Sequence, residues 1–145
     1  MSAIVVGYDG SECGDCALEE ALVLAGELGD EVVVVFGYAP PGIWGGEIAE
    51  HEQAIEELGE KMTARAKEHA AARGAEIEVE LLAKRSVEAL LDAAERHQAR
   101  MIVVGSYGDS PLKGALLGST PNKLLHLTEH PVLVVPAGAS ELPSG

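Results

Sequence analysis

The sequence predicts an α/β fold, a doubly wound open sheet of five parallel strands with helices on both faces. Short, continuous apolar runs bounded by turn residues recur along the chain, as is typical of strands that are covered on both faces. Longer segments with apolar residues at helical spacing separate these runs. Strands that alternate with helices indicate a parallel sheet, because right-handed crossovers lay the helices over its faces.

The first half of the chain contains two predicted strands and two predicted helices. Strands are expected at residues 3–8 and 31–38, where valine and isoleucine form unbroken runs. The helix between these strands has Ser11 as its N-cap and Gly29 just past its end. Residues 39–46 are predicted to form a loop, and the long helix that follows should stop at Gly74.

The second half contains three predicted strands. Residues 76–83 alternate apolar and acidic side chains, which favours a strand at an edge of the sheet. Ser86 is the expected N-cap of the next helix, and residues 101–104 form a short buried strand. A last short helix is predicted at residues 121–128, followed by a strand at residues 132–135.

Length and composition predict one domain, residues 1–137, with a disordered polar tail at residues 138–145. The formal net charge of −14 disfavours binding to nucleic acid and to anionic membranes. No apolar run is long enough to span a bilayer, and the first residues lack the basic segment of a signal peptide. Two cysteines do not make a disulfide framework, which agrees with a reducing compartment. A cytoplasmic protein is therefore expected.

A ligand site is predicted at the carboxyl ends of the strands that end near Val6 and Val104, because ligands of doubly wound sheets bind where the strand order reverses. The second of these strands is followed by the glycine-rich segment 105–121. Its glycines allow backbone amides to approach a ligand, and Gly118 and Ser119 open a helix whose free amides suit phosphate. A tight connection without a ligand explains the same glycines equally well. Neither the Walker A nor the Rossmann motif is present.

The glycine spacing resembles that of the universal stress protein family. Gly105, Gly108, Gly118 and Ser119 match the G-x2-G-x9-G-S/T motif of its ATP-binding subclass. Residues 4–11 are similar to the first strand of the family with its Asp-Gly-Ser turn, and residues 131–136 to its last strand, so the resemblance covers almost the whole chain. It implies the adenine nucleotide alpha hydrolase-like fold with strand order 3-2-1-4-5.

The resemblance also implies a ligand, ATP with Mg²⁺, and a role as a nucleotide-dependent sensor or regulator in the stress response. No set of residues in the sequence compels a hydrolase, so no catalytic residue is assigned and any ATP hydrolysis is expected to be slow and incidental. Carried over by motif, the resemblance implies that adenosine is flanked by Gly7, Tyr8 and Asp9 and that the adenine edge meets Gly37. It implies that ribose and phosphates are lined by Val104, Gly105, Tyr107 and Gly108. It also implies that the triphosphate is covered by Gly118, Ser119, Thr120 and Pro121.

A homodimer is predicted through the last strand, Val132, Leu133, Val134 and Val135. An unprotected apolar edge strand invites pairing with a second copy, and the resemblance implies the same interface.

Two positions depart from the pattern of the family. Tyr107 stands where an arginine or histidine is common, and Pro121 where a second hydroxyl residue is common, so weaker phosphate binding is expected unless Mg²⁺ or a nearby lysine, Lys113 or Lys123, offsets the loss. Asp9 either holds a ribose hydroxyl or a metal-bound water, or it caps the first helix. Protein side chains alone are not expected to form a metal site.

Other functions remain open. The same fold serves nucleotide-free interaction proteins, and Cys13 and Cys16 have the spacing of a thiol redox motif. These cysteines with His126 and His130 would imitate a zinc site, but the crossovers should place the first and last helices on opposite faces of the sheet. Trp44 either covers the adenine pocket or packs on a partner subunit. The remaining histidines, His51, His69 and His97, are predicted at the surface.

Overall fold

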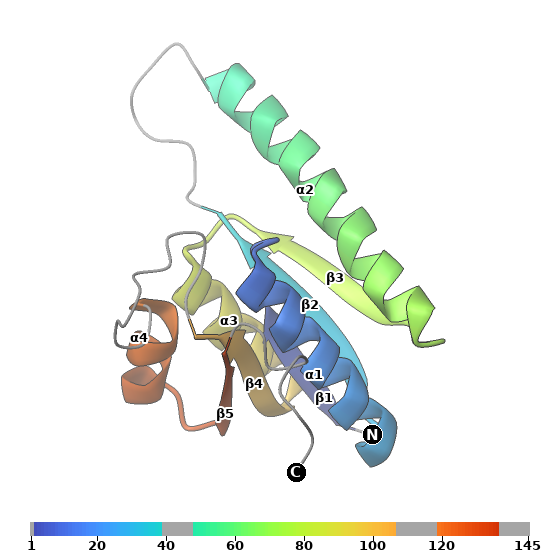
Figure 1. Ribbon diagram of the computed structural model, residues 1–145. Helices are drawn as coiled ribbons and strands as arrows, with labels where there is room; N and C mark the ends of the chain where they lie inside the picture. Colours follow the sequence, from blue (N-terminus) through green and yellow to red (C-terminus); the bar gives the residue numbers. More distant parts are fainter. Residues whose placement is uncertain (1, 39–47, 107–118, 137–145) are drawn as a thin grey trace.

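The computed structural model describes residues 2–38, 48–106 and 119–136, which form a parallel sheet with helices on both faces (Figure 1). In chain order the elements are β1 (Ala3–Gly7), α1 (Glu12–Leu28), β2 (Glu31–Gly37), α2 (Ile48–Ala72), β3 (Ile77–Leu82), α3 (Ser86–His97), β4 (Ala99–Gly105), α4 (Ser119–Leu127) and β5 (Val132–Val135). All strand pairs are parallel, in the order β3-β2-β1-β4-β5. The predicted fold class and strand order are confirmed.

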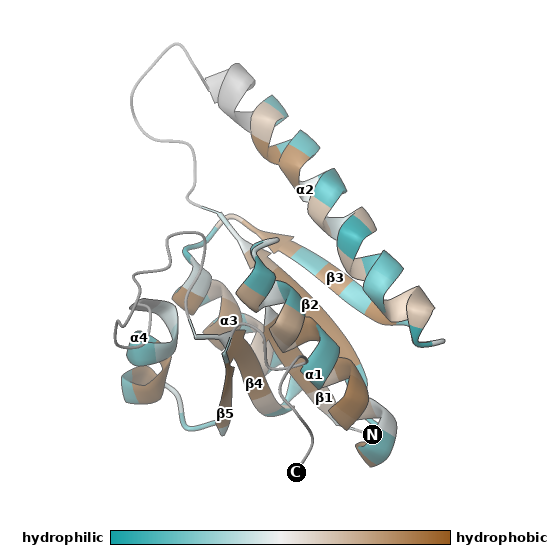
Figure 2. Cartoon of the chain, in the orientation of Figure 1, coloured by the Kyte–Doolittle hydropathy of each residue, from teal (hydrophilic) through white to brown (hydrophobic). Residues whose placement is uncertain are grey.

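The central strands are buried on both faces, which explains their continuous apolar runs. In β1, Ile4 and Val6 face a core layer shared with α1 and α2, whereas Val5 faces a second layer shared with α3 and α4. None of these three side chains is exposed to solvent. Figure 2 shows the strands at the centre of the sheet in the brown of apolar residues. The chain thus forms three layers, two helices on each side of the sheet.

Strand β3 lies at one edge of the sheet, as its alternating sequence predicts. It pairs only with β2 among the described strands, and Figure 2 shows it alternating between apolar and polar residues. Ile77 and Val79 pack against the core layer beneath α1 and α2. Glu78 and Glu80 therefore point to the other face, the one that α3 covers.

Helix α1 has the predicted caps. The Ser11 side chain accepts a hydrogen bond from the Gly14 amide at 3.1 Å, and Gly29 ends the helix with φ of 73°. Positive φ is why a glycine is favoured there. Both cap predictions are confirmed.

The cap prediction for α3 is wrong, and α4 begins two residues earlier than predicted. Helix α3 begins at Ser86 itself, and the preceding Arg85 has extended backbone without a side-chain cap. Since an N-cap residue must keep non-helical dihedral angles, a serine already inside the first turn cannot fill this role. Helix α4 begins at Ser119, so Thr120 and Pro121 both lie in its first turn. Proline is tolerated there because the first amides of a helix have no partner within it.

Charged side chains join α1 to α2. Glu19 contacts His69, with 2.6 Å between Oε1 and Nδ1, and also pairs with Arg73. Asp15 pairs with Arg65 in the same way. Burial by itself would raise the pKa of Glu19, but hydrogen bonds with His69 and Arg73 outweigh burial and hold this pKa below its ordinary value. These pairs fasten the polar helix α2 to the body of the domain.

The prediction that His69 and His97 lie at the surface holds in part, because their side chains are 27% and 20% exposed. Both rings are half-buried, His69 against Glu19 and His97 against Glu80. Sequence spacing does not reveal these carboxylates, because they come from other elements. The side chain of His51 is outside the described part of the chain.

Several predictions concern residues that the structure does not describe. These are the loop at residues 39–46 with Trp44, and the tail at residues 138–145. Within the described ranges, no helix has both the length and the apolar character needed to cross a membrane.

The ion pairs between α1 and α2 predict a pH-dependent contribution to stability. Glu19→Gln should lower the free energy of unfolding by less than about 1 kcal/mol near neutral pH, since partly exposed pairs contribute little. Because the pKa of Glu19 is lower in the folded chain, this contribution is complete above the unfolded pKa of about 4.3 and is lost as the pH falls through the folded pKa.

Urea unfolding over this pH range measures the difference between wild type and Glu19→Gln. The difference should shrink towards zero in acid. Glu20→Gln is the matched control, because Glu20 is exposed on the same helix and should change little at any pH. A Glu19→Gln difference that stays constant down to the lowest pH would contradict the assignment.

Candidate functional site

The candidate site lies beyond the carboxyl ends of β1 and β4, which are neighbours in the sheet (Figure 1). The chain leaves β1 for α1 on one face of the sheet and leaves β4 towards α4 on the other face. The strand order therefore reverses between these two strands. In doubly wound sheets this reversal opens the crevice in which ligands bind.

Asp9 forms the turn between β1 and α1. Its Oδ1 atom accepts hydrogen bonds from the Ser11 amide, at 2.9 Å, and from the Ser11 hydroxyl. Gly10, between them, has φ of 78°, a conformation that favours glycine. A side chain at Gly14 would lie 2.7 Å from Asp9 Oδ1. Asp9 thus supports the cap of α1, while its Oδ2 atom has no hydrogen bond to the described residues.

The side chain of Tyr8 faces α1 and α2 and is only 4% exposed. Its hydroxyl donates a hydrogen bond to Asp15 Oδ1 at 2.6 Å, and its amide donates to the Val35 carbonyl at 3.0 Å. Burial, and then the bond to Asp15, raise the pKa of Tyr8 well above its ordinary value. The phenol is therefore neutral and serves as a donor within the protein.

Three of the predicted site glycines are in close contact with neighbouring elements. A Cβ at Gly37 would lie 2.7 Å from the Lys84 carbonyl oxygen, before α3. A Cβ at Gly105 would lie 2.7 Å from Cys13 Cβ and 2.9 Å from the Cys13 carbonyl. A Cβ at Gly7 would meet Leu90 and the predicted site residue Val104 at 3.1 Å. Packing therefore favours glycine at these positions whether or not a ligand binds.

The phosphate-binding part of the predicted site is only partly described. Tyr107, Gly108 and Gly118 lie outside the described residues. Ser119 begins α4, Thr120 is half-buried in its first turn, and Pro121 is buried. The amides of this first turn have no partners within the helix, which makes them the described groups best suited to an anion.

Ser106 is a neighbour of the site that the sequence did not single out. Its amide donates to the Val135 carbonyl at 3.0 Å, and its hydroxyl lies 3.8 Å from Cys13 Sγ. The sequence signal available was its position directly after Gly105, at the predicted strand end. Ser106 thus joins the start of α1 to the ends of β4 and β5.

The cysteines contribute to the packing of α1, and among the described residues they join no group of potential metal ligands. Both are free thiols; Cys13 is buried at the start of α1, and Cys16 packs against the core beneath the helix. Helices α1 and α4 lie on opposite faces of the sheet, as predicted, so the cysteines and His126 do not share a face. His130 Nδ1 lies 3.2 Å from the Ala99 carbonyl.

The strand order and the helices on both faces define the chain as a doubly wound α/β protein. Comparison with known proteins agrees with this class. Residues 1–136 match the model of the universal stress protein family. The chain is 32% identical over 150 residues to the universal stress protein YxiE of Bacillus subtilis, which covers 93% of this chain and 99% of that protein. The chain belongs to the universal stress protein family.

Solved structures with the same fold include the hypothetical protein MJ0577, with a TM-score of 0.82 at 24% identity over 93% of this chain and 95% of that one. A universal stress protein in complex with cAMP has a TM-score of 0.68 at 28% identity, covering 94% and 97% of the two chains. The universal stress protein of Archaeoglobus fulgidus in complex with dAMP has a TM-score of 0.68 at 22% identity, covering 93% and 98%. Relatives with this fold thus bind adenine nucleotides.

The packing of Gly105 against Cys13 predicts a loss of stability when a side chain is added. Gly105→Ala should lower the free energy of unfolding by roughly 1–3 kcal/mol, because the backbone of α1 would have to move. Gly26→Ala is the matched control: Gly26 is exposed inside α1 with no atom within 4 Å of an added Cβ. It should stabilise the protein by up to about 1 kcal/mol. Denaturant unfolding of both variants measures the contrast, and equal stabilities would refute the close contact.

Proposed function

We propose that this protein binds an adenine nucleotide, ATP with Mg²⁺, beyond the carboxyl ends of β1 and β4. One observation carries the proposal: the G-x2-G-x9-G-S/T spacing begins at Gly105, at the point where the strand order reverses, beside the turn that holds Asp9. The complexes of relatives with cAMP and dAMP support the adenine part of the ligand.

The described residues fit such a ligand in two respects. Asp9 keeps one carboxylate oxygen without a partner in the described structure, which suits a ribose hydroxyl or a water bound to Mg²⁺. The first turn of α4 offers to a phosphate group amides that have no partner within the helix. Bound Mg²⁺ would supply positive charge against the phosphates. That charge matters here, because a protein of net charge −14 repels an anion at long range.

We further propose that nucleotide occupancy regulates how the protein associates with itself or with a partner in the stress response. The proposal assigns no catalytic residue, and any ATP hydrolysis should be slow and incidental. A cytoplasmic location remains a prediction from the sequence.

A second candidate is a nucleotide-free interaction protein of the same fold. The packing of Gly37 and Gly105 favours it, because these glycines are needed without a ligand. Pro121 also favours it, because proline removes one amide from the first turn of α4. Mass spectrometry of the ligand released from purified, denatured protein distinguishes the two candidates. An adenine nucleotide supports the first, and its absence, with no binding of added ATP, supports the second.

The nucleotide site predicts an order of severity for two substitutions. Gly118→Val should abolish ATP binding, because the branched side chain would occupy the path of phosphate to the amides and resists positive φ. Ser119→Ala should weaken binding by roughly ten- to a hundredfold, the cost of one hydrogen bond to a charged phosphate. Calorimetry with Mg·ATP measures both affinities, with circular dichroism to check folding.

The matched control is Gly26→Ala, a glycine substitution on the exposed side of α1 that should leave the affinity unchanged. Unchanged affinity in a folded Gly118→Val protein would show that the site is wrongly assigned. So would a Ser119→Ala defect as large as that of Gly118→Val.

We also propose a homodimer through β5. This strand is at an edge of the sheet, and Val132, Leu133 and Val134 are only half-buried. Leu125 and Leu127 on the adjacent α4 are 51% and 63% exposed. A second copy paired along this edge would cover the free backbone groups and apolar side chains together.

The proposed interface predicts that a charge on β5 disrupts assembly. Wild type should have twice the chain mass of 15.1 kDa by light scattering, and Val132→Lys should be a folded monomer, because a buried lysine opposes strand pairing. Leu58→Lys is the control, since Leu58 is 41% exposed on α2, which packs against α1 and against β3 at the opposite edge of the sheet. A monomeric wild type, with and without ATP, would refute the dimer.

A further inference from the structure

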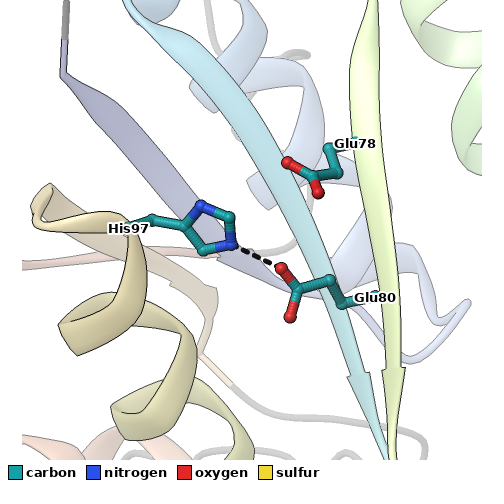
Figure 3. A group of neighbouring side chains, drawn as sticks. All are labelled: Glu78, Glu80 and His97. Atoms are coloured by element: carbon teal, nitrogen blue, oxygen red, sulfur yellow. Dashed lines mark hydrogen bonds and ion pairs between the residues drawn. The ribbon is translucent and has the colours of Figure 1, made fainter.

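A second group of ligand atoms lies away from the nucleotide site, at the β3 edge of the sheet. Glu78 and Glu80 from β3 and His97 from α3 point towards one another (Figure 3). Each offers one ligand atom, and these atoms all lie within 4.8 Å of one another. The Glu80 and His97 side chains are only 13% and 20% exposed, whereas Glu78 is open to solvent.

The fold explains why these residues meet. Successive side chains of a strand alternate between faces, so Glu78 and Glu80 share the face that α3 covers. His97 is the last residue of α3, and Gln98 follows it with φ of 49°, which turns the chain into β4. The ring of His97 is thus directed back to Glu80, where Nε2 contacts Oε2.

We propose that Glu78, Glu80 and His97 bind a divalent transition metal ion, with Zn²⁺ as the representative. One imidazole and two carboxylates form a mixed nitrogen and oxygen set that suits zinc, whereas Mg²⁺ and Ca²⁺ prefer six or more oxygen ligands. Zinc bonds to these atoms are about 2.0–2.2 Å long, so bound ligand atoms lie about 3–4 Å apart. To close the set around the ion, the exposed Glu78 side chain must rotate, and His97 Nε2 must release its proton and move away from Glu80 Oε2, which it contacts directly in the metal-free chain. Water completes the coordination on the open side.

The surroundings favour a cation at this point. The carbonyl end of α3 lies beside the cluster and carries partial negative charge. Two cations are near: Arg96 pairs with Glu80 Oε1 and with Asp92, and Lys84 also pairs with Asp92. Glu80 Oε2 faces His97 instead. Such outer partners orient a ligating carboxylate. The net charge of −14 also attracts cations to the surface in general.

This site shares no residue with the proposed nucleotide site. His97 precedes the amino end of β4, whereas Asp9 follows the carboxyl end of β1 and Gly105 is the last residue of β4. A metal ion here would bridge β3 to the end of α3 and would stabilise the folded chain by binding it in preference to the unfolded chain.

Zinc titration of the nucleotide-free protein tests the proposal by competition with a chelating dye. Wild type should bind one ion at this site, and His97→Gln and Glu78→Gln should each bind at least about tenfold more weakly. Glu78 is exposed and makes no hydrogen bond within the described ranges, so its substitution tests metal binding without endangering the fold. Zinc should raise the melting temperature of wild type and not of His97→Gln.

Two control variants identify other sources of zinc binding. His69→Gln removes a half-buried histidine that also contacts two carboxylates, but through separate ring nitrogens that do not converge on one point. The double variant Cys13→Ser with Cys16→Ala removes the thiols. Both should keep the affinity of wild type, and His97→Gln should keep its affinity for adenine nucleotides. Absence of zinc binding, full affinity in His97→Gln, or loss in either control would overturn the proposal.

Discussion

The contact between Gly105 and Cys13 is the constraint on which the arrangement around the candidate site depends. The first turn of α1 lies so close to the end of β4 that a Cβ at position 105 would meet the Cys13 backbone at 2.9 Å. The carboxyl ends of β1 and β4 are neighbours in the sheet, and this contact places the start of α1 against the end of β4. The turn formed by Asp9, Gly10 and Ser11 then has little freedom, because it must connect β1 to a helix already fixed against β4.

The same contact gives a packing reason for the first glycine of the G-x2-G-x9-G-S/T motif. A glycine that allows a ligand to approach and a glycine that allows a helix to approach look identical in a sequence. At Gly105 the structure shows the second reason, and nucleotide binding would be an additional use of the same small residue. Family membership and the complexes of relatives with cAMP and dAMP bear on nucleotide binding and not on the packing of Gly105.

Acidic residues have distinct roles in a chain that carries 24 of them. Asp15 and Glu19 hold α2 against α1 by pairing with arginine and histidine. Asp9 supports the turn at the end of β1, while Glu80 on the edge strand β3 contacts His97 at the end of α3. Individual acidic residues thus form contacts between helices and support a turn. At the β3 edge, two of them form part of the proposed metal site.

The sequence by itself determined the fold, because hydrophobic periodicity reports which faces of an element are covered. The runs in β1 and β2, the alternation in β3 and the caps of α1 at Ser11 and Gly29 are local patterns, and each predicted its element. The position of the candidate site followed from strand order and motif spacing. The residues 107–118 that carry much of the motif lie outside the described structure, so their contacts remain predictions.

Only the tertiary structure decided which residues meet across elements. Whether Ser86 caps α3 depends on one pair of dihedral angles, and the side chain alone does not fix them. The need for glycine at positions 37 and 105 comes from chain segments far away in sequence. The partial burial of His69 and His97, and the convergence of His97 with Glu78 and Glu80, likewise arise from packing between separate elements. Such contacts have no local periodicity, and for that physical reason the sequence could not show them.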